Sequence, residues 1–369
     1  MKVVIIGAGV MGLMTARELA KAHCDVVLLE RMTVGQEASW AGGGIVSPLY
    51  PWRYSAPVTA LASAAQLTYP ALADELVLET GIDPEFTRCG LLMLDAEDAR
   101  DAEAWAAINQ HMLLPWPASY LQQRLPGLAS HWRGGLWMPE IANIRNPRLL
   151  KALRRSLEMM RVVIHEQVEI VRWHKEASGR VMAVSTEDGR QFDADVFVIC
   201  SGAWSRQVLE SYGGEPLSVR PVRGQMLLYK LAPGELPCIV MAEGRYVIPR
   251  RDGHVLCGST LEEAGFDKST TMQARRSLMA SAGRLWPALM GREPLAHWAG
   301  LRPGAPNGIP FIGPVPDSEN LWMNAGQFRN GLVLAPASAR LLADQLLGRE
   351  TGLDARPYQL PSTFISAGH

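Results

Sequence analysis

The start of the chain alternates short apolar runs with a glycine-rich turn. The apolar stretch Lys2–Ile6 predicts a buried parallel strand, and the periodic pattern over Met14–Ala22 predicts a helix. A second apolar stretch, Val26–Leu29, predicts another strand that ends in the acid Glu30. The first thirty residues therefore predict a strand, turn, helix and strand of one parallel sheet.

Later segments are predicted to extend this sheet. Val196–Cys200 is an apolar run that ends in a glycine turn, and it predicts another buried strand. The stretches Val162–Ile164 and Val168–Val171 are predicted to join the same sheet, with a helix over Pro147–Met160 leading into it. A last helix is expected from near Pro336, because proline suits the first turn of a helix, to Gly348.

Two blocks between these pieces have a different pattern. The first contains the apolar run Leu91–Leu94 and an amphipathic helix near residues 96–110. The second contains three short strands separated by turns, over Gln225–Tyr229, Tyr246–Pro249 and His254–Gly258. Short strands broken by turns are typical of an antiparallel sheet.

These patterns predict an α/β fold with two domains. A Rossmann-like dinucleotide-binding domain is expected over 1–80, 145–215 and 300–369, and a mostly antiparallel β substrate domain over 81–144 and 216–299. A chain of 369 residues is long enough for two cores.

Composition narrows the function classes. The formal net charge is −1, so no global basic field attracts nucleic acid. No apolar run is long enough to span a bilayer, so we expect no transmembrane segment and a cytoplasmic location. The five cysteines are scattered and odd in number, which argues against a disulfide framework, and the eight histidines show no metal-binding spacing. We therefore expect no metal site.

The pattern Gly7-x-Gly9-x-x-Gly12 between strand and helix is a dinucleotide-binding fingerprint. Gly7 permits the tight turn, Gly9 lets the backbone approach a pyrophosphate, and Gly12 lets the helix pack on the sheet. The helix N-terminus offers unpaired N–H groups to phosphates. Glu30, eighteen residues after Gly12, is suited to accept hydrogen bonds from a ribose.

Three further segments suggest backbone held close to a ligand. Gly42–Gly44 follows the first two strands, and Ser201–Trp204 follows the strand that ends at Cys200. The glycine-bounded loop Gly326–Gly331 leads into the last helix and offers N–H groups to a developing anion. A flexible linker remains an alternative for Gly42–Gly44.

Together these motifs resemble the D-amino acid oxidase-type flavoproteins, the DAO family. The resemblance covers essentially the whole chain, and it is most specific at Trp298–Gly304 and Gly326–Gly331. Within the family, the chain is most similar to the bacterial enzymes that oxidise glycine for thiamin biosynthesis. The resemblance implies non-covalent FAD and oxidative deamination of glycine, or of small amines such as sarcosine or D-alanine, with oxygen as acceptor and hydrogen peroxide as product.

The resemblance also implies roles for particular residues. Arg302 would bind the substrate carboxylate, Tyr246 would lie over the substrate, and Arg329 would lie near the flavin. Tyr246, Leu261, Arg302 and Arg329 would contact the substrate. The predicted cofactor-binding residues are Gly7, Ala8, Gly9, Val10, Met11, Gly12, Glu30, Arg31, Ser39, Ala41, Gly42, Gly43, Gly44, Val168, Ser201, Gly202, Trp204, Arg302, Phe328, Arg329, Asn330, Gly331 and Leu332.

From the residues alone, other interpretations stay open. Arg302 suits a carboxylate because its planar fork can make two hydrogen bonds, but it could instead pair with a buried acid. Tyr246 could be an ordinary strand aromatic and Arg329 a solvated loop residue. The alternative functions are a sarcosine or D-amino acid oxidase, a quinone-linked dehydrogenase such as a cyanide-forming glycine dehydrogenase subunit, a tRNA-modifying oxidase domain and an inert flavin-binding module. A homo-oligomer is possible.

Two departures from the family pattern concern the pocket. Gly244 stands where a relative carries histidine, and Leu261 stands where it carries methionine. Relatives with covalent flavin use a cysteine in the loop where this chain has Asn307 and Gly308, which argues against a covalent link.

Overall fold

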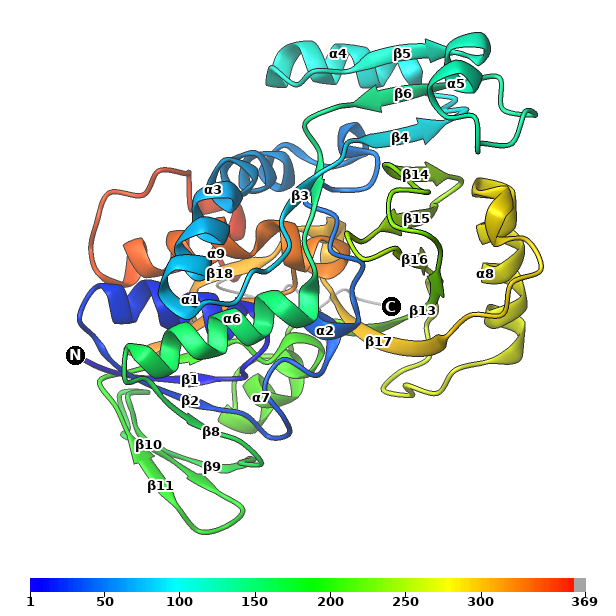
Figure 1. Ribbon diagram of the computed structural model, residues 1–369. Helices are drawn as coiled ribbons and strands as arrows, with labels where there is room; N and C mark the ends of the chain where they lie inside the picture. The colour runs from blue at the N-terminus through cyan, green and yellow to red at the C-terminus, as the bar shows by residue number, and fades with distance from the viewer. Residues whose placement is uncertain (362–369) are drawn as a thin grey trace, which may run out of the picture.

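The computed structural model describes residues 1–361, and two large sheets organise it (Figure 1). The first is a six-stranded sheet of order β18-β19-β12-β1-β2-β8. Its strands are β1 (Lys2–Ile6), β2 (Asp25–Leu29), β8 (Val163–His165), β12 (Val196–Ile199), β18 (Phe311–Pro314) and β19 (Leu321–Ala325). All neighbours pair in parallel except β18 with β19, so the predicted Rossmann-like sheet is confirmed.

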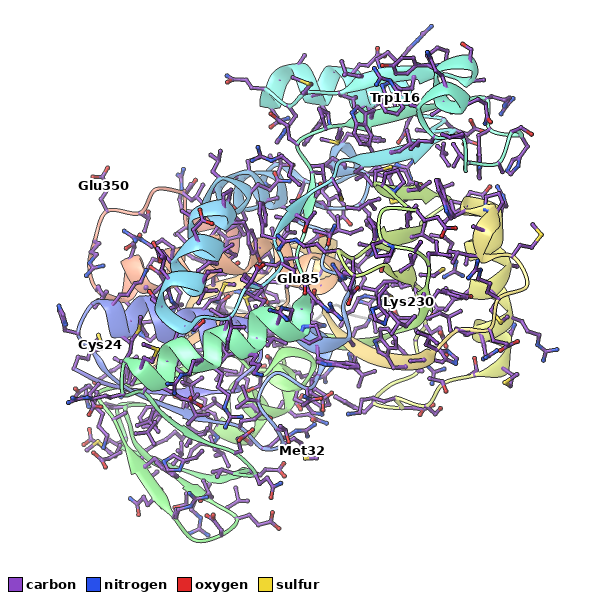
Figure 2. The ribbon with its side chains drawn as sticks, viewed as in Figure 1. Cys24, Met32, Glu85, Trp116, Lys230 and Glu350 are labelled. Carbon is purple, nitrogen blue, oxygen red and sulfur yellow. The ribbon has the colours of Figure 1, made fainter. Side chains whose placement is uncertain are left out.

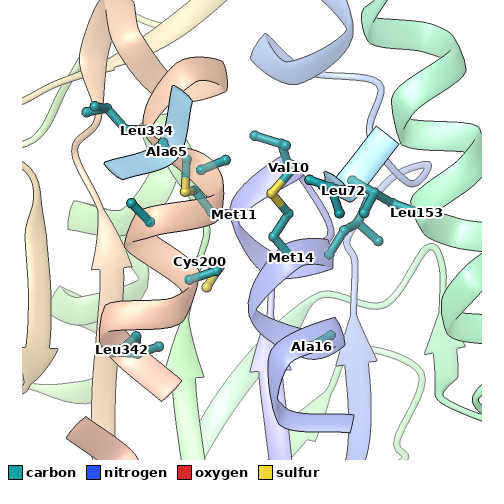
Figure 3. Close-up of a cluster of buried hydrophobic side chains, with 14 of the residues drawn as sticks. Val10, Met11, Met14, Ala16, Ala65, Leu72, Leu153, Cys200, Leu334 and Leu342 are labelled. Atoms are coloured by element: carbon teal, nitrogen blue, oxygen red, sulfur yellow. The ribbon is translucent and has the colours of Figure 1, made fainter. Parts of the chain in front are cut away.

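Helices cover one face of this sheet, and a small sheet and a helix cover the other. The first face carries α1 (Val10–Lys21), α3 (Ala56–Thr80), α6 (Asn146–Met159) and α9 (Gly331–Leu346). Figure 3 shows α1 side chains between those of α9, such as Leu334, and those of α3 and α6, such as Leu72 and Leu153. The second face carries β9 (Ile170–Lys175), β10 (Val181–Thr186), β11 (Gln191–Asp193) and α7 (Ser205–Tyr212).

Two details of this region differ from the sequence prediction. The first helix starts at Val10 rather than at Met14, so Gly12 lies inside it. The stretch Val168–Val171 does not join the six-stranded sheet, because β9 pairs with β10 in a separate antiparallel sheet. Gln167 has a φ of 55° and turns the chain away after β8.

The last helix also starts earlier than predicted. It begins at Gly331, and Pro336 lies within its second turn instead of opening it. Proline cannot donate to the carbonyl of Leu332 four residues earlier, but the hydroxyl of Tyr69 on α3 donates to that carbonyl. A contact from a distant helix therefore satisfies the group that proline leaves unpaired.

The second large sheet has eight strands in the order β17-β13-β16-β15-β14-β4-β6-β5. They are β4 (Leu91–Leu94), β5 (Leu114–Pro117), β6 (Gly134–Met138), β13 (Arg220–Lys230), β14 (Ile239–Ala242), β15 (Arg245–Pro249), β16 (His254–Gly258) and β17 (Ala296–Gly304). Every neighbouring pair is antiparallel except β14 with β4, which confirms the mostly antiparallel second sheet.

Helix α8 (Met272–Leu285) packs on one face of the second sheet, and Tyr246 and Ile248 face the other. The remaining elements are α2 (Ala38–Ala41), α4 (Ala99–Asn109), α5 (Ala118–Arg124), β3 (Thr87–Arg88), β7 (Ala142–Asn143) and short 3₁₀ turns at Pro51–Arg53, Gly202–Trp204, Pro287–Leu289, Pro306–Gly308, Phe328–Asn330 and Arg356–Tyr358. Figure 2 shows Trp116, on the edge strand β5 of this sheet, far from Cys24, which lies just before β2 of the first sheet.

Charged side chains join the two sheet regions. Arg145, just before α6, pairs with Glu85 at 3.2 Å and with Asp252 at 2.9 Å. Figure 2 shows Glu85 in the middle of the molecule, between the two regions. The division into two domains stays a proposal. We would move its last boundary past Gly304, because a boundary at 299 and 300 falls inside strand β17, which pairs with β13 along its whole length.

Candidate functional site

An elongated cavity runs from the carboxyl ends of β1, β2 and β12 to strands β15 and β17 of the second sheet. It encloses about 1800 Å³ including its open mouth. The glycine motif and Arg302 line this same cavity, so its two ends share one continuous space.

The glycine motif forms one end of the cavity. Gly7 has a φ of 102°, and a Cβ there would stand 2.6 Å from the carbonyl oxygen of Cys200. A Cβ on Gly12 would stand 1.9 Å from the carbonyl oxygen of Gly7, so only glycine lets α1 pack this closely on β1. Because α1 begins at Val10, its first turn lies at the same end of the cavity, which Val10 and Met11 line.

Glu30 is buried beside this turn. Its Oε2 accepts from the backbone N–H of Ala8 at 2.8 Å, and its Oε1 accepts from that of Met32 at 2.9 Å. A carboxylate has about four acceptor positions, so two remain for ligand hydroxyls. The side chain is thus oriented in advance and lines the cavity.

Helix α2 and the glycine segment after it are held against the cavity by two buried polar side chains, Asn146 and Arg250. Arg250 donates to the carbonyl of Gly43 at 2.8 Å, and burial lowers the pKa of Arg250 to about 10. Asn146 donates to the carbonyl of Ser39 at 2.7 Å, and the hydroxyl of Ser39 accepts from the N–H of Val10 at 2.9 Å. These fixed contacts argue against a flexible linker.

Arg302 lies at the opposite end of the cavity, on β17. Its Nη2 donates to the hydroxyl of Ser259 at 2.7 Å, and its Nη1 donates to the carbonyl of Thr260 at 3.2 Å. Burial lowers the pKa of Arg302 below its ordinary value, and the nearby positive charge of Arg329 lowers it further, against an opposing effect of Tyr246. Within residues 1–361, neither Arg302 nor Arg329 forms an ion pair with a carboxylate.

Tyr246 and Arg329 complete this end. Tyr246 is buried on β15, and its hydroxyl contacts the sulfur of Met226 at 3.6 Å. A Cβ on Gly43 would stand 3.3 Å from the Tyr246 ring, so the glycine segment and the tyrosine are in direct contact. The arrangement offers cationic and hydroxyl groups to an anion at this end of the cavity.

The loop before α9 forms the third wall. Gln327 is buried, and its Nε2 donates to Asn324 Oδ1 at 2.6 Å, while Asn324 donates to Thr15 on α1 at 3.2 Å. This chain of hydrogen bonds links the loop to the helix that starts at the glycine motif. The free N–H groups at the start of α9 also face the cavity.

Most predicted site residues line the one cavity. They are Gly7, Gly9, Val10, Met11, Glu30, Arg31, Ser39, Gly42, Gly43, Gly44, Val168, Ser201, Gly202, Trp204, Tyr246, Arg302, Phe328, Arg329, Gly331 and Leu332. Ala8, Gly12, Ala41 and Asn330 lie behind the wall instead. Ala8 donates to Glu30, Gly12 packs on Gly7, the carbonyl of Ala41 accepts from Trp298, and Asn330 is buried.

Leu261 does not lie in the cavity wall. It is 55% exposed, because the chain stays extended after β16 and side chains alternate. Thr260 and Glu262 turn inward, where the Thr260 hydroxyl accepts from Gln225 and Glu262 pairs with Arg223. Leu261 between them points outward and does not line the cavity, so the structure does not bring it together with the other predicted substrate contacts.

Sequence reasoning missed the segment that follows β16. Ser259 and Thr260 hold Arg302, and farther along Phe266 lies 5.5 Å from the Trp204 ring. Lys268 pairs at 2.9 Å with Glu37, which lines the cofactor end of the cavity. No motif marks these residues. Their proximity depends on the register of β13, β16 and β17.

Within the part of the chain that the structure describes, no helix is long and apolar enough to cross a membrane.

Comparisons with known proteins agree with this geometry. The protein-family model of the FAD dependent oxidoreductases, DAO, matches residues 2–345. The chain is 52% identical over 358 residues to a glycine oxidase of Pseudomonas aeruginosa, covering 97% of this chain and 98% of the relative. It is 32% identical to the bifunctional protein ThiO/ThiG of Synechocystis, where the match covers 94% of this chain and 52% of the relative.

Among solved structures, glycine oxidase from Geobacillus kaustophilus superimposes with a TM-score of 0.92 at 30% identity, covering 98% of both chains.

Proposed function

The chain belongs to the DAO family of FAD-dependent oxidoreductases, and from this premise we propose that its cavity binds FAD at the glycine motif and oxidises glycine beside Arg302. Glycine, oxygen and water would give glyoxylate, ammonia and hydrogen peroxide. The resemblance to glycine-oxidising enzymes of the DAO family, inferred from the sequence, is confirmed by the family match and by the glycine oxidase relatives.

The residues at the first end of the cavity fit FAD. The cradle of Gly7 and Gly12 leaves backbone in place of side chains, and the start of α1 supplies N–H groups for a pyrophosphate. Glu30 keeps free acceptor positions for ribose hydroxyls. When bound, FAD accepts the two electrons of the amine and passes them to oxygen.

One observation carries the substrate assignment: Arg302 has a lowered pKa in the cavity and has only neutral acceptors among the described residues. A desolvated guanidinium without a counter-ion is suited to bind an incoming carboxylate through two hydrogen bonds. Tyr246 and Arg329 lie near enough to Arg302 to influence its pKa, and we assign them to the same carboxylate and its surroundings.

Among residues 1–361, no acid or histidine lines the substrate end of the proposed site. The acids that line the cavity are Glu30, Glu37 and Glu169, and they come from the segments around the cofactor end. The amine must therefore lose its proton before oxidation without help from a side chain, because the bond to hydrogen at Cα breaks readily only when the nitrogen lone pair is free. We expect kcat/KM to rise with pH through an ionisation of the substrate amine.

The experiment uses the purified protein. Anaerobic addition of glycine should bleach the visible flavin absorbance, and oxygen should restore it with release of hydrogen peroxide. Glycolate, which has the carboxylate but no amine, is the matched control and should bind without bleaching. A protein that takes up no FAD, or one that oxidises D-phenylalanine better than glycine, would contradict the proposal.

The same experiment separates the alternatives. Bleaching by glycine without reoxidation by oxygen indicates a quinone-linked dehydrogenase, and faster bleaching by sarcosine or D-alanine indicates a neighbouring oxidase. Yellow colour that stays with the acid-precipitated chain would contradict non-covalent FAD.

The relatives named ThiO/ThiG motivate a place in thiamin synthesis, in which oxidised glycine feeds formation of the thiazole ring. A cytoplasmic location is part of the proposal, since all five cysteines are free and scattered. A homo-oligomer also stays a proposal.

A further inference from the structure

The guanidinium of Arg302 is held by a hydroxyl and a backbone carbonyl, and neither is acidic. Nη2 donates to Ser259 Oγ at 2.7 Å, and Nη1 donates to the carbonyl of Thr260 at 3.2 Å. From the third side, the backbone of Gly224 approaches so closely that a Cβ there would stand 2.1 Å from Nη1. The plane of the guanidinium is therefore set by contacts from three segments.

Ser259 is itself held in place. It is 8% exposed, and its carbonyl accepts from Nη1 of Arg245. Gly258, the residue before it, ends β16 and pairs with Met226 on β13 and with Tyr246 on β15. The register of three strands thus determines where the Ser259 hydroxyl lies.

The hydrogen bonds of Arg302 leave the donors that a carboxylate needs. A guanidinium carries five N–H groups, of which Ser259 and Thr260 take two. Tyr246 lies close enough to raise the pKa of Arg302 through a hydrogen bond, so at least two N–H groups remain. Because both partners are neutral, they orient the guanidinium without cancelling its charge. An aspartate at position 259 would orient it as well, but would compete with the substrate.

We propose that Ser259 is a positioning residue, whose hydroxyl fixes the guanidinium of Arg302 in the orientation that receives the substrate carboxylate. The inference rests on the proposed function and adds to it a residue outside the DAO-type motifs.

The first test replaces Ser259 with alanine in the FAD-loaded enzyme. We expect the KM for glycine to rise about tenfold, because a hydrogen bond to a charged group is lost, while kcat at saturating glycine stays within about twofold. The dissociation constant of glycolate, followed by the change in flavin absorbance, should rise in parallel. Ser259→Thr keeps a hydroxyl and should restore both values toward those of the native enzyme.

A matched control lies elsewhere in the fold. The hydroxyl of Ser156 accepts from Nε of Arg17 at 3.1 Å and donates to Glu79 at 2.7 Å. Ser156 on α6 and Arg17 on α1 are both buried, and neither lines the cavity. Ser156→Ala removes the same kind of hydrogen bond. It should lower the melting temperature and leave the KM for glycine and the glycolate affinity unchanged.

The double variant with Arg302→Ala decides whether Ser259 acts through the arginine. In that background Ser259→Ala should produce no further rise in KM, because the group that it orients is absent. If Ser259→Ala does not fold, Ser259→Cys keeps the size of the side chain but replaces the oxygen with a weak acceptor, and it should raise KM in the same way.

The outcomes that overturn the inference are distinct from those that overturn the proposed function. An unchanged KM in Ser259→Ala, together with a raised KM in Arg302→Ala, excludes Ser259 as a positioning residue and leaves the proposed function standing. A rise in KM that persists in full in the Arg302→Ala background also overturns the inference. An unchanged KM in Arg302→Ala overturns the assignment of the anchor itself.

Discussion

Arg17 and Arg302 are two enclosed arginines that the fold holds in opposite ways. Arg17 lies among α1, α3 and α6, where its Nη2 contacts Glu75 at 3.0 Å and Glu79 at 2.6 Å. Its Nε donates to Ser156. The positive charge of Arg17 is therefore neutralised within the protein. Its ion pairs join α1 to α3, and its hydrogen bond to Ser156 adds α6.

Arg302 has the same side chain but no such neutralisation. Its partners are the hydroxyl of Ser259 and the carbonyl of Thr260, and within residues 1–361 no carboxylate pairs with it. The comparison shows how to distinguish a structural arginine from a binding one. A charge that is paired inside the fold contributes to stability, whereas a desolvated charge held only by neutral groups is available to a ligand.

The largest expected effect is that of Arg302→Ala on the oxidation of glycine. We expect kcat/KM for glycine to fall by about thirtyfold to several thousandfold, since truncating one partner of a desolvated charge pair costs about 2–5 kcal/mol. FAD content and melting temperature should stay near native, because the fold loses a charge that it did not neutralise. Steady-state kinetics and thermal unfolding check both. A variant with native KM and a much lower melting temperature would place Arg302 in the structural class with Arg17.

The complementary substitution is Arg17→Met. It should lower the free energy of unfolding by about 2 kcal/mol, less than for a fully buried pair because Glu75 and Glu79 are partly exposed. The KM for glycine should not change. Lys21→Met is the control, since Lys21 pairs with the same Glu75 at the surface and should cost about 1 kcal/mol or less. Chemical denaturation measures all three proteins, and equal losses in the two variants would contradict the prediction.

The sequence predicts the cofactor end of the site far better than the surroundings of Arg302. The turn at Gly7, the strand that ends at Glu30 and the segment Gly42–Gly44 follow from local rules of turn geometry and strand order. Their neighbours in space are also near in sequence or come from adjacent parallel strands. Local pattern is enough for such features.

The rest depends on contacts between distant segments. Ser259 and Gly224 meet Arg302 only through the register of β13, β16 and β17, which no local pattern specifies. Alternation after β16 turns Leu261 outward, against the prediction. Helix α9 starts earlier than its sequence predicts, because Tyr69, over 260 residues away, satisfies the carbonyl that Pro336 leaves free. The neighbours of Arg302, the direction of Leu261 and the start of α9 thus depend on strand register and burial, which arise only in the folded chain.

A smaller effect is expected when the space beside Arg302 is filled. In Gly224→Ala the new methyl group would stand 2.1 Å from Nη1, so the guanidinium must move at a cost of about 1–2 kcal/mol. We expect the KM for glycine to rise severalfold to about tenfold with flavin content unchanged. Gly352→Ala is the matched control, because nothing lies within 4 Å of its added Cβ. A native KM in Gly224→Ala would show that the guanidinium tolerates displacement, and that its orientation is not set as tightly as Ser259 and Gly224 imply.

The smallest expected effect is a difference between Arg17 and Arg302 in how their contributions to stability depend on pH. Hydrogen bonding from Lys21 lowers the pKa of Glu75 against the opposing effect of burial, and Arg17 adds to this lowering. Burial works to raise the pKa of Glu79, but hydrogen bonds from Arg17 and Ser156 outweigh it and lower the pKa. A carboxyl whose pKa is lower in the folded than in the unfolded protein stabilises the fold above its ordinary pKa of 4.5, and this contribution is lost as the pH falls through the folded value.

The stability difference between the native protein and Arg17→Met should therefore shrink, by a few tenths of a kcal/mol to about 1 kcal/mol, when denaturation is measured at pH 4 instead of pH 7. Arg302→Ala should show no such narrowing, because no carboxylate of the described chain pairs with Arg302. If the Arg302→Ala difference narrowed at pH 4 as the Arg17→Met difference does, a protein carboxylate would have to neutralise Arg302. The contrast between the two arginines would then fail, and with it the reason for assigning Arg302 to the substrate.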